Sequence, residues 1–163
     1  MRIDANVPKI KFVTCFRILL AAGILMLALA SSPASEKLAS WNRFRGPNGS
    51  GVARDARPPV SIGTNHLSWK TAVPRGLSSP VVADGKVFVT GLENERLVTL
   101  CFDTVMGRRL WQQDAPEVPI ENFHSFNSPT TPTPCTDDER IYVYFGSYGL
   151  LCYDFSGRVV WRK

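Results

Sequence analysis

The sequence predicts an all-β fold in which short antiparallel strands recur along the second half of the chain. Two observations predict it. After residue 40, apolar runs of about five residues alternate with turn residues, and no window has the apolar periodicity of a helix. In addition, the stretch CFDTVMGRRLW at residues 101–111 returns as CYDFSGRVVW at residues 152–161, one residue shorter.

The first 30 residues have the layout of a secretory signal peptide. Arg2, Lys9, Lys11 and Arg17 precede the apolar run ILLAAGILMLALA at residues 18–30, which ends in a small-x-small pattern. A membrane-spanning helix needs roughly 20 apolar residues, so this run is short for one. We predict cleavage after Ala30 and export to the periplasm or cell envelope. The alternative is an uncleaved anchor, which would be the only contact of the chain with a membrane.

The charge of the chain lies largely in this leader. Four of the 19 Lys and Arg residues and one of the 14 Asp and Glu residues precede Ser31, which leaves 15 against 13, a net charge near +2. A nucleic-acid-binding surface needs a clustered basic patch, whereas these basic residues are scattered. We therefore predict no nucleic-acid partner.

Residues 31–66 are predicted to be a polar spacer and a lead-in rich in glycine and proline. The run WNRFRGPNGSGVA at residues 41–53 is not a phosphate-binding loop, because Gly51 is followed by Val52 rather than by Lys and then Ser or Thr. Glycine instead supplies backbone angles that other residues avoid. Asn48 begins a possible glycosylation sequence, Asn-Gly-Ser.

From residue 67 onward, each apolar run is predicted to be a strand. Asp84-Gly85 marks a tight hairpin turn, and Met106-Gly107 and the GSYG and FSGR sequences mark others. A connector rich in Pro and Thr covers residues 127–140. The predicted strands comprise residues 67–73, the two halves of 79–91, 96–103, 108–113, 141–145, 150–154 and 159–163.

The copies align position by position. Asp84 and Asp138 are separated by 54 residues, Cys101 and Cys152 by 51, and Trp111 and Trp161 by 50, so we expect the length differences in the loops, GLENER against GSYG. Trp69 precedes Trp111 by 42 residues and ends a partial third copy. A repeat of 40 to 50 residues with about four strands is the size of a β-propeller blade. Asp would accept backbone N–H bonds in the turn, and Trp would fill the gap between neighbouring blades.

These residues resemble the tryptophan-docking repeat A-x-D-x-x-T-G-x-x-x-W of the pyrroloquinoline-quinone (PQQ) dehydrogenases and their non-enzymatic relatives. Cys101, Asp103, Gly107 and Trp111 fit it at full length, and the copy at residues 152–161 fits with one residue deleted. Residues 41–163 look like the N-terminal part of exported PQQ-like repeat proteins of planctomycete-type bacteria. The resemblance implies an eight-bladed propeller of the quinoprotein type, of which residues 67–163 hold about two to two and a half blades. We therefore expect an N-terminal fragment; the rival is a short protein that assembles with another chain.

The resemblance leaves two functions open. PQQ enzymes use the quinone, a calcium ion, a catalytic Asp and often two adjacent cysteines, and the sequence has no adjacent cysteine pair. Asp103 and Asp154 belong to the structural turn. We predict a non-catalytic exported scaffold or binding module whose partner is an envelope protein or polysaccharide, with no cofactor. The alternative is a piece of a PQQ-dependent oxidoreductase that uses PQQ and calcium.

We assign no catalytic, cofactor-binding or metal-ligating residue from the sequence. His124, beside Ser125, Asn127 and Ser128 in the connector region, is a better candidate for a contact residue than His66, but neither has a nucleophile and base pattern. The acidic run at residues 137–139 is interpreted as a solvated hairpin tip. Cys101 and Cys152 are predicted to be buried strand thiols, with a disulfide as the alternative; Cys135 is the third cysteine after the leader.

Overall fold

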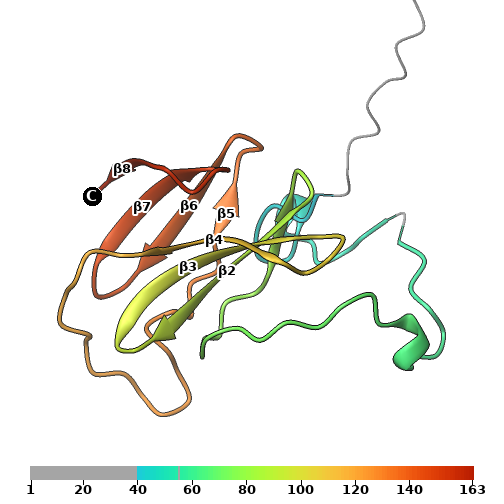
Figure 1. The fold of residues 1–163 in the computed structure, drawn as a ribbon, viewed down its shortest axis with the longest axis horizontal. Coiled ribbons are helices and arrows are strands. Elements are labelled where there is room, and N and C mark those ends of the chain that lie inside the picture. The colour runs from blue at the N-terminus through green and yellow to red at the C-terminus, as the bar shows by residue number, and fades with distance from the viewer. Residues whose placement is uncertain (1–39, 55) are drawn as a thin grey trace, which may run out of the picture. The chain divides into compact units, whose positions relative to one another are not determined.

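Two antiparallel four-stranded sheets make up the fold (Figure 1). The computed structural model describes residues 40–54 and 56–163, so the predicted signal peptide and residues 31–39 of the spacer lie outside the described residues. Each sheet is a meander, with strand order β1-β2-β3-β4 in the first and β5-β6-β7-β8 in the second. The strands are β1 Val81–Ala83, β2 Lys86–Glu93, β3 Arg96–Asp103, β4 Arg109–Asp114, β5 Cys135–Thr136, β6 Arg140–Phe145, β7 Gly149–Asp154 and β8 Val159–Arg162.

The predicted all-β class is confirmed. The helical elements of the described residues are two single 3-10 turns, η1 Pro47–Gly49 and η2 Thr64–His66. Over the same residues no helix is long and apolar enough to cross a membrane. The hairpin predicted at Asp84-Gly85 joins β1 to β2, and both residues have positive φ, +47° and +67°. This is the backbone that a two-residue hairpin turn needs, and Gly adopts it without a Cβ clash.

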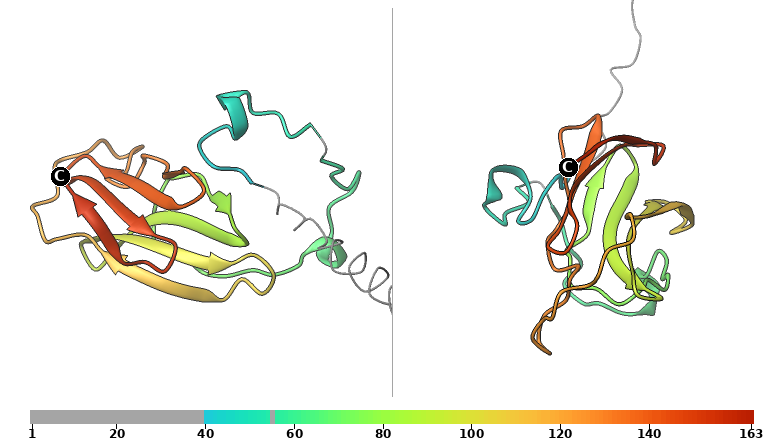
Figure 2. Two further views of the ribbon diagram at one scale, coloured as in Figure 1. Left: turned by 90° about the horizontal axis from the view of Figure 1, so that it is seen from above. Right: turned by 90° about the vertical axis from the view of Figure 1, so that its left-hand side faces the viewer.

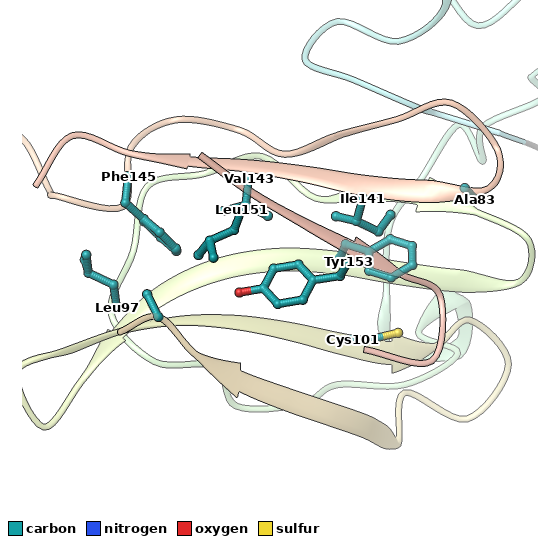
Figure 3. Packing of buried hydrophobic residues seen from close by; sticks show 10 residues of the cluster. Ala83, Leu97, Cys101, Ile141, Val143, Phe145, Leu151 and Tyr153 are labelled. Carbon is teal, nitrogen blue, oxygen red and sulfur yellow. The ribbon is translucent and has the colours of Figure 1, made fainter. Parts of the chain in front are cut away.

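The core lies between the two sheets, which pack face to face (Figure 2). Side chains alternate between the faces of a strand, so every second residue of β6 and β7 points to the first sheet. Tyr153 lies between the sheets together with side chains of both (Figure 3). The buried cluster contains residues of the first sheet and of the position directly after β4, namely Ala83, Phe88, Leu97, Cys101 and Ala115. It also contains residues of the second sheet, namely Ile141, Val143, Phe145, Leu151 and Tyr153.

The repeat extends to details of the strands. Phe88, Cys101 and Trp111 lie side by side across the first sheet, and Tyr142, Cys152 and Trp161 take the same places in the second. Both sheets shift register directly after the cysteine, at Cys101/Phe102 and at Cys152/Tyr153. The two sheets are therefore two copies of one blade.

Three expectations about the elements need correction. Residues 67–73 form no strand, because no described strand lies beside them to complete a backbone ladder. The extra residues of the first copy lengthen β2 and β3 to eight residues each, against six in β6 and β7, and the turn itself is only Asn94-Glu95. A short strand, β5, lies inside the predicted connector and pairs with β6.

The first residues of the lead-in form backbone hydrogen bonds with both sheets. Trp41 pairs with Val82 of β1 through two backbone hydrogen bonds, of 2.8 and 3.0 Å. The carbonyl of Asn42 accepts a hydrogen bond from the N–H of Thr136 in β5 at 2.9 Å. Residues 41 and 42 thus connect the first strands of both blades.

The three cysteines of the described residues are free thiols. Cys101 and Cys152 are fully buried and Cys135 is exposed, which confirms the first interpretation of the two strand cysteines. Burial raises the pKa of the Cys101 thiol to about 12, so this side chain stays neutral and packs as a small apolar group.

Replacing Tyr153 by Phe is not expected to destabilise the fold. Its hydroxyl is buried and makes no hydrogen bond within the described residues. Burial raises the pKa of Tyr153, which the nearby Thr99 hydroxyl partly offsets without reaching hydrogen-bond geometry. Because Tyr153→Phe removes an unpaired buried polar atom, it should leave the free energy of unfolding unchanged or raise it by up to about 1 kcal/mol in a denaturant titration.

The matched control is Tyr142→Phe. The Tyr142 hydroxyl donates to Asp137 Oδ2 at 2.6 Å, so this variant should be no more stable than the wild type. A clear loss of stability in Tyr153→Phe would show that its hydroxyl has a partner after all.

Candidate functional site

The contact between the two blades is built on Trp111. Its indole N–H donates to the carbonyl of Phe155 at 3.0 Å, and its ring lies against Phe88 and Tyr153. Gly157 lies beneath the ring: a Cβ there would be 2.7 Å from the indole. The glycine is required for this close approach, and its φ of +89° also favours glycine.

The same contact is made once more, by Trp69 on the first blade. The Trp69 indole donates to the carbonyl of Thr104 at 2.8 Å and covers Gly107, where a Cβ would be 2.5 Å from the ring. Trp69 therefore keeps the position that the repeat predicts, although its segment is not a strand.

The two repeat aspartates hold the turns beneath these tryptophans. Asp103 Oδ1 accepts hydrogen bonds from the N–H groups of Val105 and Met106, at 2.9 and 2.7 Å. Asp154 accepts from Ser156 and Arg158 in the same way. The Ser156 hydroxyl, with the N–H and guanidinium of Arg158, lowers the pKa of Asp154 to about 2. Both carboxylates are occupied in turn geometry, as the sequence predicts.

A groove of about 800 Å³ opens at the other end of the blades, between the β2–β3 hairpin and the segment that joins β4 to β5, residues 115–134, which is called the connector from here on. One wall is the end of the lengthened hairpin, residues 92 and 94–96, and the other is residues 117–123 of the connector. Pro119 fixes φ within this wall, and Pro116 fixes φ directly before it. Its apolar lining consists of Leu92, Val118 and Ile120, which pack against the buried cluster, and of the exposed Phe123.

The rim of the groove is acidic. Glu95, Glu117 and Glu121 line it and are exposed, against the single cation Arg96. Arg96 is already engaged, because its guanidinium lies 3.2 Å from Glu117 and 3.9 Å from Asp114. The lining therefore carries an excess of negative charge in a chain whose formal net charge is +5.

The walls are tied to both blades. The N–H of Ala115 donates to the Leu97 carbonyl at 2.8 Å, which holds the start of the connector on β3. The N–H of Glu121 donates to Ser147 Oγ at 3.1 Å, in the turn between β6 and β7. Gly146 leaves room there for the Glu121 carboxylate. The groove wall is thus hydrogen-bonded to the first blade at residue 115 and to the second blade at residue 121.

A buried hydroxyl cluster fixes the end of the connector. Thr90 Oγ1 donates to the Thr130 carbonyl at 3.1 Å, and the hydroxyls of Ser128 and Thr130 are 2.9 Å apart. Ser79 N–H donates to Thr133 Oγ1 at 3.0 Å. These bonds hold the residues before β5 against the first blade.

The sequence candidates lie outside any catalytic arrangement. His124 is exposed beside the groove, and its Nδ1 accepts a hydrogen bond from the Phe126 N–H at 3.3 Å. His66 is exposed in η2. Residues 137–139 form the β5–β6 turn, where Asp137 Oδ1 accepts from the N–H groups of Glu139 and Arg140. The hydroxyl of Tyr142 lowers the pKa of Asp137, with smaller help from those N–H groups.

The described residues do not fit a calcium and quinone site. Among them, no three His, Cys, Asp or Glu side chains come together as metal ligands. Cys101 and Cys152 are buried in separate sheets rather than adjacent.

Sequence reasoning missed the groove. The residues that build it, EVPIE at 117–121, alternate acidic and apolar side chains around a proline, and this alternation was the available signal. The local sequence does not show that the β2–β3 hairpin, with Leu92, lies opposite residues 117–121. That position depends on the direction in which the chain leaves β4.

Two four-stranded meanders, joined by a tryptophan on a glycine turn, define a protein built of β-propeller blades. Residues 52–163 match the model of the family described as outer membrane protein assembly factor BamB, a PQQ-like repeat family, and the chain belongs to this family. The match confirms the PQQ-like resemblance and covers both sheets. Membership indicates a propeller scaffold or an oxidoreductase-like module. Among curated proteins, none matches the chain.

Proposed function

We propose that the chain is a non-catalytic, exported propeller module that binds an extended segment of an envelope protein in the connector groove. The single observation that carries the proposal is the groove itself, in which apolar side chains and exposed glutamates line a wall that is hydrogen-bonded to both blades. The family description, an assembly factor of outer membrane proteins, supports a protein partner.

The chemistry of the groove indicates which segment it takes. Leu92, Val118 and Ile120 offer a partly buried apolar surface to one or two aliphatic side chains. Glu95 and Glu121 are positioned to pair with Lys or Arg residues that flank those side chains. The partner segment is therefore extended, basic and apolar in alternation.

Export is supported by the layout of residues 1–30. The test is the intact mass of the protein recovered from the envelope fraction of its host. A chain that begins at Ser31 is expected, and a chain that retains Met1 in the cytoplasmic fraction would contradict export.

Binding is tested with the full chain and a fluorescein-labelled peptide of alternating Lys and Leu, with an alternating Glu and Leu peptide for comparison. When the protein is added, we expect the fluorescence anisotropy to rise for the basic peptide and to stay unchanged for the acidic peptide. The double variant Glu95→Gln/Glu121→Gln should weaken binding about tenfold, since each rim charge contributes roughly 0.7 kcal/mol. Salt should weaken binding as well.

The matched control is Glu139→Gln, which removes an exposed carboxylate in the β5–β6 turn, outside the groove. It should bind like the wild type. Equal binding of both peptides, or equal loss in the control, would overturn the proposal. So would binding of a neutral polysaccharide that displaces the basic peptide.

A further inference from the structure

The lead-in forms a cavity against β1. Its volume is about 580 Å³, within the range of small-ligand sites, and it shares no lining residue with the connector groove. We call it the lead-in cavity. Its apolar lining consists of Trp41, Pro47, Val52, Ala53, Ala56 and Val82.

The aromatic wall of the lead-in cavity is fixed before any ligand binds. The two backbone hydrogen bonds to Val82 hold Trp41 on β1. Gly46 is buried directly against the Trp41 ring, where an added Cβ would be 2.6 Å from the indole. The N–H of Gly49 donates to the Gly46 carbonyl at 3.0 Å and closes the loop over the ring. A ligand therefore loses little affinity to ordering of this wall.

Two polar side chains of the lining have unused hydrogen-bonding capacity. The hydroxyls of Ser40 and Ser50 are engaged, because each donates to a nearby backbone carbonyl at 3.4 Å. The Asn48 amide and the Arg54 guanidinium, by contrast, have no hydrogen bond or ion pair within the described residues. Both side chains are therefore available to a ligand.

The surroundings of the cavity are cationic. Arg43, Arg45 and Arg57, together with Arg54, are exposed and form no ion pair within the described part of the chain. The acid of this stretch of sequence is Asp55, which lies outside the described residues. Four arginines against one acid give the lead-in a charge opposite to that of the connector groove, which favours an anionic ligand.

Each feature of the cavity selects one part of that ligand. A guanidinium pairs with a carboxylate through two parallel N–H bonds. A free amide both donates and accepts hydrogen bonds, which hydroxyl groups satisfy and ionised carboxylates, which only accept, do not. An apolar wall with an indole ring suits a flat surface of C–H groups. A sugar ring that carries a carboxylate combines all three.

We infer that the lead-in cavity binds a uronic acid unit of an acidic polysaccharide. Arg54 pairs with the carboxylate of the sugar, Asn48 bonds its hydroxyl groups, and the ring of the sugar lies against Trp41. The other arginines attract further carboxylates of the same polysaccharide. The inference is independent of the peptide segment proposed for the connector groove, because the two sites have no residue in common.

The test is saturation-transfer difference NMR of the full chain with a trimer of galacturonic acid. The trimer should bind with a dissociation constant on the order of 1 mM, and its ring protons should receive saturation. The same trimer with every carboxylate methylated should bind about tenfold more weakly, because the charge is lost. A tripeptide of glutamic acid, which has the charges without the hydroxyl groups, should also bind about tenfold more weakly.

Substitutions locate the site. Arg54→Gln should weaken binding of the trimer about fivefold. Asn48→Asp keeps a residue type that tolerates the left-handed backbone, φ +61°, and should weaken binding about tenfold by opposing the carboxylate of the sugar. The matched control is Arg57→Gln, which removes an exposed arginine of the same segment outside the cavity lining and should bind like the wild type.

A further control separates this site from the connector groove. Glu95→Gln/Glu121→Gln should bind the trimer like the wild type, whatever it does to the basic peptide. A loss in that variant would place the sugar in the connector groove and overturn the inference. Equal binding of the methylated trimer or of the acidic tripeptide would overturn it, as would equal losses in Arg54→Gln and Arg57→Gln. So would the absence of saturation transfer at tenfold the expected dissociation constant.

Discussion

Gly157→Ala is expected to lower the free energy of unfolding by about 3 kcal/mol, one of the two largest effects among the substitutions considered. Two costs combine at this position. The backbone has φ +89°, which an alanine adopts only with strain, and the added Cβ would be 2.7 Å from the Trp111 ring. Because that ring is held by the Phe155 carbonyl and by neighbouring aromatic side chains, it cannot move away cheaply. The measurement is a urea titration followed by tryptophan fluorescence.

Gly49→Ala separates the two costs. Gly49 has a similar backbone, φ +64°, with nothing within 4 Å of an added Cβ, so only strain of about 1 kcal/mol should remain. Equal losses in the two variants would show that the packing of Trp111 on Gly157 contributes little.

Trp111→Ala is expected to cost about 4 kcal/mol, since it removes a large ring from the core between the blades. It also leaves the Phe155 carbonyl without the indole donor. Trp111→Phe keeps most of the ring and loses the hydrogen bond, so a loss of about 1.5 kcal/mol should follow. Both are measured by the same titration.

Trp161→Ala is the matched control, because Trp161 has the same place in the second blade without an acceptor in the described structure. The free energy of unfolding should fall by less than about 1 kcal/mol in this variant. A double variant, Trp111→Ala with Gly157→Ala, should cost less than the two single losses added together, because both remove one contact. Additive losses would contradict the expectation that the two substitutions remove one and the same contact between Trp111 and Gly157.

The fold was predictable because its signals are local and repeated. Asp84-Gly85 specifies a hairpin by backbone geometry alone, and the boundaries of β3 follow from one apolar run that ends at Asp103. The spacing of Trp69, Trp111 and Trp161 gave the blade period. Each of these features is decided within a few residues, and the second copy repeats the signal.

The errors arose where structure depends on a distant partner. Residues 67–73 have the pattern of a strand but no neighbouring strand in the described chain. β5 has only two residues and too little pattern to be detected, and it exists because β6 pairs with it. Trp41 was assigned to a loop because its partner, Val82, lies about 40 residues away.

The candidate site was less predictable than the fold for the same reason. His124 was singled out by residue type, yet the groove beside it is made by side chains with no unusual chemistry, such as Val118 and Glu121. Their role comes from the lengthened hairpin opposite and from the anchoring of Glu121 on Ser147. Neither contact has a local signature.

The two ends of the blades have different roles. The Asp, Gly and Trp residues that join blade to blade are gathered at the β3–β4 and β7–β8 turns, whereas the groove is formed at the β2–β3 turn and the connector. Substitutions, insertions or exchanged segments in the β2–β3 turn and the connector therefore do not change the residues that join one blade to the next. Evolution or a protein engineer can therefore vary what the molecule recognises, one connector at a time, while the blades keep their stacking.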